Sequence, residues 1–393
     1  MRALPLLLLL CAPLLLAQTV DEREAEEALR QQAFRDNMAA VVADLNNNSY
    51  EKLLQAMDRD DFLETAFGLR LIDQRMKRDF RERMDEPEQF AGFIESQYAE
   101  VAKDGIKASL LAVESRGDRG RAVVRFDMSH FQSNYYEYDL RLTESGELQI
   151  LDWTDFLWGH KITDSIGLAM VQAQPSASAA RKLADTSNLS QAQVFQLMEI
   201  LKSTRDRNFE RYFQIVEQLD DNMKRQRIVL KTGLDATRTA RKRREQRRVL
   251  EAIDKYYPND VLFALPLLDY YFPDRQYEKA FAALVRVRDH LGIDDAVTNA
   301  RLSSAQLVLQ RADEALALAE QATQQEPGLE LGWWALLRAQ VAKQDYAAGL
   351  QSLQHLQSAF GHQLGPDDLA KDPSLRGFVR SADYQGWLKS QGD

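Results

Sequence analysis

The sequence predicts a mainly α-helical protein: an α+β N-terminal domain, made of helices and a four-stranded antiparallel meander, is followed by an α-solenoid. Three observations predict this fold class. Apolar residues keep a helical spacing up to Gly105, alternate with polar residues between 107 and 152, and return to a helical spacing after 180. A short pattern then recurs near the C-terminus at the period of one helical hairpin. Helices followed by a meander are typical of an α+β layer.

Residues 1–17 have the features of an export signal. Arg2 provides a positive start, a leucine-rich run follows, and Ala17 is a small residue at a suitable cleavage position. The run is too short to span a bilayer of roughly 30 Å, and no later apolar stretch reaches about 18 residues. We expect an exported protein, periplasmic or secreted, with no integral membrane segment in the mature chain. A retained N-terminal anchor is the alternative interpretation.

The composition argues against several kinds of site. Cys11 is the only cysteine and precedes the expected cleavage position, so the mature chain would have no disulfide and no thiolate metal ligand. The formal net charge of −10 argues against a general affinity for nucleic acid. The sequence has no glycine-rich phosphate loop, HExxH zinc motif or GxSxG elbow, and its five histidines are dispersed. We therefore expect no catalytic residue, no metal site and no cofactor.

The first helices of the α+β domain, which we expect to cover residues 24–173, carry apolar stripes. The clearest stripe has the spacing i, i+4, i+7, i+8 and i+11 and comprises Phe34, Met38, Val41, Val42 and Leu45. The run from Asn46 to Ser49 interrupts this stripe, and Ser49 is placed to cap the next helix.

The meander follows from the change of period. The predicted strands cover residues 107–114, 122–128, 136–142 and 148–152. The predicted turns between them lie at residues 116–118, 133–134 and 145–146. Strands connected by such short turns must be antiparallel.

This domain resembles the cystatin-like cones, a group that includes nuclear-transport-factor-type domains. The resemblance depends on the order of helices and meander and on the segment Gly146–Trp153, where a strand after a glycine turn ends in a hydrophobic-Asp-Trp stretch. It implies a space for a small molecule between sheet and helices, and some members are enzymes. Acid–base chemistry in such a pocket would use His130, Tyr136, Tyr138, Asp152, Asp155 and His160.

Small residues and a proline at 174–180 predict a linker. Residues 181–260 have helical spacing and are candidates for degenerate repeats of the solenoid that follows. Within them, basic residues crowd the stretch from Arg238 to Arg248. Because acidic residues lie nearby and the whole chain is acidic, we interpret this stretch as a solvated helix face or a contact for an acidic partner.

The C-terminal repeats share the pattern aromatic-or-small, x, x, small. It occurs in Tyr277–Ala280, Ala312–Ala315 and Tyr346–Gly349, at intervals of 315 − 280 = 35 and 349 − 315 = 34 residues. A helical hairpin of this size cannot bury its own apolar face, so each copy needs a neighbour on which to stack.

Residues 261–360 resemble the tetratricopeptide repeat family. The residues that match its motif are Trp333, Leu336, Ala315, Ala319 and Pro327. The sequence departs from the motif at Leu268 and Leu337, which replace a small residue, and at Pro266, which should kink or end a helix. We expect Trp333 to lie in the core and residues 361–393 to form capping helices.

The resemblance implies a concave groove lined by residues of the first helix of each hairpin: Asp269, Ser304, Trp334 and Arg338. A groove with charged and apolar groups would suit an extended peptide. We therefore expect a non-enzymatic interaction protein that binds a partner protein or peptide. The alternatives are a small-molecule binder or enzyme that uses the N-terminal cone, with the repeats for docking, and a passive envelope scaffold. The sequence leaves the oligomeric state and the identity of the partner open.

Overall fold

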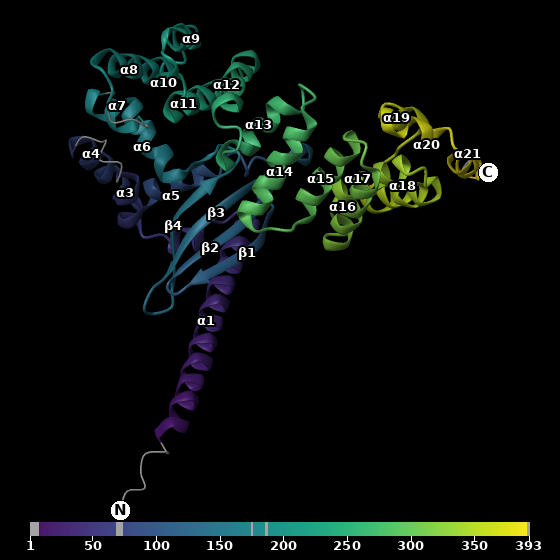
Figure 1. The fold of residues 1–393 in the computed structure, drawn as a ribbon, viewed down its shortest axis with the longest axis horizontal. Coiled ribbons are helices and arrows are strands. Elements are labelled where there is room, and N and C mark those ends of the chain that lie inside the picture. Colours follow the sequence, from purple (N-terminus) through teal and green to yellow (C-terminus); the bar gives the residue numbers. More distant parts are fainter. Residues whose placement is uncertain (1–7, 68–73, 174–175, 185–187, 391–393) are drawn as a thin grey trace, which may run out of the picture. The chain divides into compact units, whose positions relative to one another are not determined.

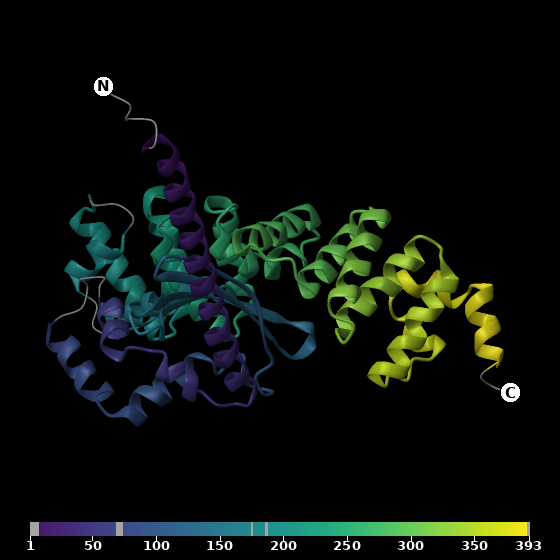
Figure 2. The same ribbon diagram turned by 90° about the horizontal axis from the view of Figure 1, so that it is seen from below.

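The computed structural model describes residues 8–67, 74–173, 176–184 and 188–390. The chain forms two compact units. Unit 1 comprises residues 1–155 and 160–205, and unit 2 comprises residues 156–159 and 206–393. Each unit is described by itself (Figures 1 and 2). The domain boundaries expected from the sequence remain predictions.

Unit 1 combines helices with one antiparallel sheet. Its helices are α1 (Leu8–Asn46), α2 (Glu51–Gln55), α3 (Arg59–Phe67), α4 (Gln74–Met84), α5 (Pro87–Gln97), α6 (Ile162–Ala173), α7 (Ala177–Leu183) and α8 (Gln191–Arg205). Its strands, which pair in chain order, are β1 (Ala108–Arg116), β2 (Arg119–Asp127), β3 (Ser133–Leu142), β4 (Leu148–Asp155) and β5 (His160–Lys161).

The sheet has five strands, so the expectation of four was wrong. Strand β5 contains only two residues, which pair with Thr154 and Asp155, and two residues are too few to show an alternating pattern. The turns at Gly117 and Gly146 are confirmed, and both glycines have positive φ. The turn expected at 133–134 is wrong, because these residues begin β3 and a 3₁₀ turn at Ser129–Phe131 makes the connection.

The N-terminal helix α1 lies along the sheet and is in contact with β1 (Figure 2). All five residues of the predicted apolar stripe are buried. A Cβ atom at Gly120 of β2 would come within 2.8 Å of the Phe34 ring, so the helix needs a residue without a side chain there. Ser49 accepts a hydrogen bond from the Glu51 N–H at 3.2 Å, close to its predicted capping position.

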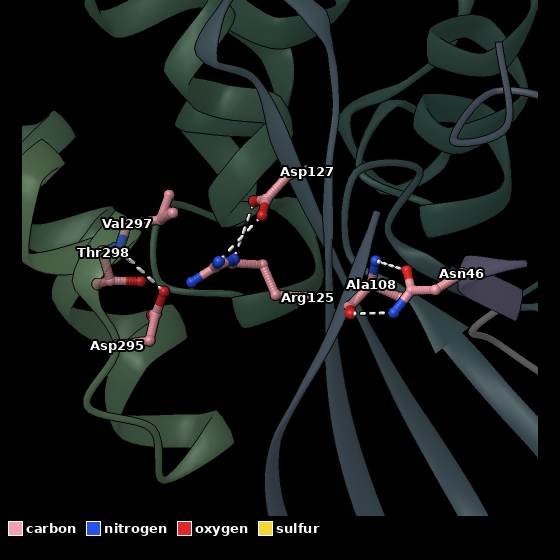
Figure 3. A network of polar contacts seen from close by, with 7 residues as sticks. All are labelled: Asn46, Ala108, Arg125, Asp127, Asp295, Val297 and Thr298. Atoms are coloured by element: carbon pink, nitrogen blue, oxygen red, sulfur yellow. Dashed lines mark hydrogen bonds and ion pairs between the residues drawn. The ribbon is translucent and has the colours of Figure 1, made fainter. Parts of the chain in front are cut away.

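Side chains of α1 also form hydrogen bonds with backbone groups of β1, the edge strand of the sheet. The Asn46 amide accepts from the Ala108 N–H at 2.6 Å and donates to the Ala108 carbonyl at 2.9 Å (Figure 3). Gln31 donates to the carbonyl of Val113 further along the same strand. An edge strand with unpaired backbone groups is a template for aggregation, so these side chains protect β1. Figure 3 also shows Arg125 of β2 in a two-bond ion pair with Asp127.

The segment expected to be a linker is partly helical. Residues 174–175 lie outside the described residues, and α7 begins at Ala177. The Ser176 hydroxyl caps this helix by accepting from the Ala179 N–H at 3.1 Å. The alanines that suggested a flexible linker are also good helix formers.

Unit 2 is helical in its described residues. Its longer helices are α9 (Phe209–Gln218), α11 (Arg227–Thr239), α12 (Arg243–Tyr256), α13 (Ala264–Tyr271), α14 (Tyr277–Leu291), α15 (Ala296–Val308), α16 (Ala312–Gln325), α17 (Glu330–Ala342), α18 (Tyr346–Phe360) and α21 (Ala382–Ser390). The shorter ones are α10 (Asp221–Lys224), α19 (Pro366–Ala370), α20 (Arg376–Val379) and the 3₁₀ turns η2 (Val261–Phe263) and η3 (Pro373–Leu375). The expectation that Pro266 would end a helix was wrong, because α13 continues past it to Tyr271. Pro266 lies in the first turn, where a missing N–H breaks no helical hydrogen bond.

One turn conformation recurs in four hairpins of unit 2. In the turn after each first helix one residue has a left-handed conformation: Arg241, Arg275, Gln310 or Gln344. The intervals are 275 − 241 = 34, 310 − 275 = 35 and 344 − 310 = 34 residues. In each hairpin the N–H of the residue that follows the left-handed one donates to the carbonyl five residues earlier, at 2.8–2.9 Å. The pairs α11–α12, α13–α14, α15–α16 and α17–α18 therefore repeat one local geometry.

The last hairpins nest in series. Helix α15 packs on α16 and on α17, and α17 packs on α16 and on α18. The small residues of the sequence pattern, Ala280, Ala315 and Gly349, are all buried. Between α13–α14 and α15–α16 the main contact is made by α14 rather than by α13. This C-terminal region is thus a helical repeat compatible with the tetratricopeptide arrangement.

Candidate partner-binding surface

The four residues expected in the groove lie on first helices of the hairpins. Asp269 is on α13, Ser304 is on α15, and Trp334 and Arg338 are on α17. Asp269, Ser304 and Arg338 occupy equivalent positions, because 304 − 269 = 35 and 338 − 304 = 34. Whether a partner contacts them stays a prediction.

Trp334 and Arg338 come together on α17. They are one helical turn apart, and the Arg338 guanidinium lies over the Trp334 ring at 5.4 Å from its centroid. The Trp334 indole N–H donates to Glu330 at 3.0 Å, one turn earlier on the same helix. Such a pairing holds the aromatic ring and the cation in fixed positions.

Two residues from the segment after α18 complete this cluster. His362 Nε2 lies 2.6 Å from the same Glu330 oxygen, and the His362 ring meets Trp334 edge-on at 5.6 Å. Asp372 accepts from Arg338 Nε at 2.8 Å. We call Glu330, Trp334, Arg338, His362 and Asp372 the Trp334 cluster. Its four charged or titratable side chains are each about 30% exposed.

Asp372 pairs with Arg338 and also caps η3, and both contacts affect its pKa. Burial alone would raise its pKa, but hydrogen bonds from Ser374 and Arg338 hold the pKa below its usual value. The Ser374 hydroxyl and N–H both donate to Asp372, which caps η3. The carboxylate thereby fastens the segment after α18 to α17.

Asp269 and Ser304 are not part of this cluster. Asp269 is exposed and accepts from Arg238 at 3.2 Å and from Gln246 at 3.3 Å, so its partners belong to α11 and α12. The Ser304 hydroxyl donates to the Ala300 carbonyl of its own helix at 3.0 Å. The structure therefore brings two of the four predicted residues together and separates the other two.

Sequence reasoning missed Glu330, His362 and Asp372. Glu330 could have been found, because it lies four residues before Trp334 and such residues share a helix face. His362 and Asp372 gave no signal, because their contacts with α17 depend on how the chain turns after Phe360.

Trp333 is half-buried, which corrects the expectation of a core residue. It lies where an alanine-rich cluster between α15, α16 and α17 meets a second cluster around Leu337 and Phe378. Its indole N–H donates to the Pro327 carbonyl at 2.8 Å, and its ring stacks on His355 at 3.7 Å. The N–H has to reach a surface turn, and this keeps part of the ring exposed.

The six candidate acid–base residues of unit 1 have mostly structural partners. His130 is exposed on the 3₁₀ turn, whereas the other five are buried. Burial raises the pKa of Asp152, although hydrogen bonds from Thr163 and from backbone N–H groups oppose this effect. These bonds tie β4 to the first turn of α6.

Tyr136, Asp155 and His160 lie opposite one another on β3, β4 and β5. Burial and the nearby Asp155 carboxylate raise the pKa of Tyr136 well above its usual value. The Tyr138 and Tyr98 hydroxyls are hydrogen-bonded to each other at 2.9 Å. Among the described residues, no group of three or more His, Cys, Asp or Glu side chains is arranged to hold a metal ion.

A cavity of unit 1 lies among α4, α5 and α6 instead of between sheet and helices. Its volume is about 820 Å³. Its apolar lining includes Met76, Phe80, Phe93 and Met170, and its charged lining comprises Arg75, Asp79 and Arg83.

No protein-family model and no curated protein matches the chain. Two solved structures of MamA, designated MSR-1 and AMB-1, are similar to part of it. Each has 18% sequence identity to this chain. The match to the MSR-1 structure covers 44% of this chain and 97% of the MamA chain, with a TM-score of 0.30. The match to the AMB-1 structure covers 48% of this chain and 98% of the MamA chain, with a TM-score of 0.31. Scores at this level leave the family of the chain open.

Proposed function

We propose that the protein binds a partner protein or peptide on the first-helix face of its hairpin stack, without catalysing a reaction. The observation that carries this proposal is the Trp334 cluster: an aromatic ring, a cation and two carboxylates, partly exposed, on a helix of a serial stack. Stacked helical hairpins usually present such extended surfaces to other polypeptides. Aromatic and arginine side chains supply most of the energy in such interfaces.

The proposal is tested by affinity capture with the full chain as bait. The double variant Trp334→Ala/Arg338→Ala removes the aromatic–cation pair and should lose the captured protein. The matched control is Lys255→Ala/Tyr256→Ala, because Lys255 lies over the Tyr256 ring at 4.8 Å in a similar pair on the second helix α12. Equal capture by both variants and by the wild type would contradict the proposal.

We also propose that the protein is exported to the periplasm or secreted. The leucine-rich start of the sequence and the absence of cysteine after residue 11 support this location. Among the described residues, no helix is both long and apolar enough to cross a bilayer. Fractionation of cells and N-terminal sequencing of the mature protein test the proposal, and an intact Met1 in the cytoplasmic fraction would contradict it.

A second candidate function is the binding of a small molecule by unit 1. The cavity among α4, α5 and α6 favours it, because its volume is in the range of ligand sites and its lining offers both apolar and polar groups. A thermal-shift screen of the full chain, compared with a Phe93→Arg variant that fills the cavity, would test it. Shifts that are equal in the two proteins would contradict it.

A further inference from the structure

A second cavity lies in unit 2, between α12 and α13. Its volume is about 650 Å³. Leu250, Leu268, Tyr270 and Phe272 give it apolar walls. Phe272 is unusual among large apolar side chains because 40% of its surface is exposed. A concave apolar surface of this size can accept a side chain of another molecule.

The walls of this cavity are fixed by ion pairs. Arg247 forms a two-bond pair with Asp274, with both distances 2.6 Å. Its guanidinium also lies over the Tyr270 ring at 5.7 Å. Asp269, on the same rim, is held by Arg238. The cavity therefore exists with its shape set before a ligand arrives.

Four cations at the start of α12, one of which lines the cavity, have no carboxylate partner among the described residues. Arg241, Lys242, Arg243 and Arg244 are all exposed, and in the described part of the chain none of them forms an ion pair. Arg243 also lines the cavity, one helical turn before Arg247. The basic stretch seen in the sequence thus divides into paired arginines that build the wall and free cations at its edge.

The position of the free cations is unfavourable for the helix itself. They lie at and just before the first turn of α12, which has no side-chain cap. The N-terminus of a helix carries a partial positive charge, so cations there destabilise it. Four unpaired cations at such a place, in a chain of net charge −10, call for a function outside the stability of the fold.

We propose that this surface is a docking site for an acidic segment of a partner protein. Carboxylates of the segment pair with Arg241, Lys242, Arg243 and Arg244, and an apolar side chain of the segment enters the cavity. The apolar lining of the cavity favours a polypeptide over a polyphosphate such as nucleic acid, because a polypeptide can place an apolar side chain beside its carboxylates. The site is separate from the Trp334 cluster, and the proposal stands without it.

The test uses the full chain and a fluorescein-labelled peptide of glutamates around one phenylalanine. The double variant Arg243→Glu/Arg244→Glu should weaken peptide binding at least tenfold. It should stay folded, because acidic residues are favourable in a first helical turn. The matched control is Arg380→Glu/Lys389→Glu, which reverses two other exposed cations and should bind the peptide as the wild type does.

Two further measurements separate the contribution of the cations to peptide binding from that of the apolar cavity. A peptide with glutamine in place of glutamate should bind at least tenfold more weakly. Phe272→Ser should weaken the phenylalanine peptide several-fold but leave a peptide of glutamates alone unchanged. Binding that does not depend on Arg243 and Arg244 would overturn the proposal. So would an RNA oligonucleotide or a vesicle of anionic lipid that binds more tightly than the peptide and needs the same arginines.

Discussion

Replacement of Trp333 by alanine measures how much the junction between two hairpins contributes to stability. Truncation of a fully buried aromatic side chain costs about 3–5 kcal/mol. Trp333 is only half-buried, so we expect about half of that value from lost apolar contact. Its ring stack on His355 contributes about another 0.5–1 kcal/mol. The hydrogen bond to Pro327 is exposed and should contribute little.

The expected total is a loss of about 2–3.5 kcal/mol from the free energy of unfolding of unit 2. For a unit of this size, the melting temperature should fall by roughly 4–14 °C. The assay is calorimetry of the full chain, with hydrogen exchange of the peptides from α17 and α18 to assign the transition. The control is Val308→Ala on α15, because Val308 is 47% exposed and should shift the transition by less than about 1 °C. A Trp333→Ala shift no larger than that of the control would refute the reasoning.

Four other substitutions have definite expected results in unfolding experiments. Gly349→Ala should be neutral or stabilising by about 0.5–1 kcal/mol, because a Cβ there would lie 3.4 Å from Val341 and 3.5 Å from Phe378. Gly349→Leu has no such room and should cost about 1–3 kcal/mol; equal stability of the two variants would count against the packing. Asn46→Ala should cost about 1–3 kcal/mol and promote aggregation in light scattering, because both backbone groups of Ala108 lose their partner. Folding lowers the pKa of Asp372, so the ionised carboxylate stabilises the folded state. This stabilisation is fully present above the unfolded pKa of about 4 and is lost as the pH falls through the folded pKa. Asp372→Asn should remove that part of the acid sensitivity, and an unchanged pH profile would contradict the role of Asp372.

Periodicity predicted the elements whose contacts are local. The stripe from Phe34 to Leu45 and the buried small residues Ala280, Ala315 and Gly349 all follow from spacing along one helix. Spacing failed where an element is short or where the relevant property is a backbone angle. Strand β5 is too short to have a period, and the left-handed turn at Arg241 is not visible in a side-chain pattern. That turn extends the repeated geometry into α11–α12, which the sequence alone could not align with the later hairpins.

The candidate surface was predictable only in part, because spacing along the sequence predicts contacts within one helix and not contacts between distant segments. Trp334 and Arg338 share a helix face, so their proximity follows from a spacing of four residues. His362 and Asp372 reach them from 28 and 34 residues away along the chain, through turns whose course no local pattern fixes. Asp269 has the repeat position of Arg338, but its partners lie on α11 and α12, in the preceding hairpin, whereas Asp372, the partner of Arg338, lies after α18.

The nesting of one hairpin on the next is tested most directly by a disulfide between α16 and α17. A Cβ atom at Gly332 would lie 3.6 Å from the Cβ of Ala322, and a disulfide requires about 3.5–4.5 Å between these atoms. In a Cys11→Ser background, Ala322→Cys/Gly332→Cys should form a disulfide almost completely under mild oxidation, as measured by mass spectrometry of the peptides. The control pair is Ala322→Cys/Gly386→Cys, because a Cβ at Gly386 would have no heavy atom within 4 Å. Oxidation of the first pair no greater than that of the control would show that the hairpins do not nest in series.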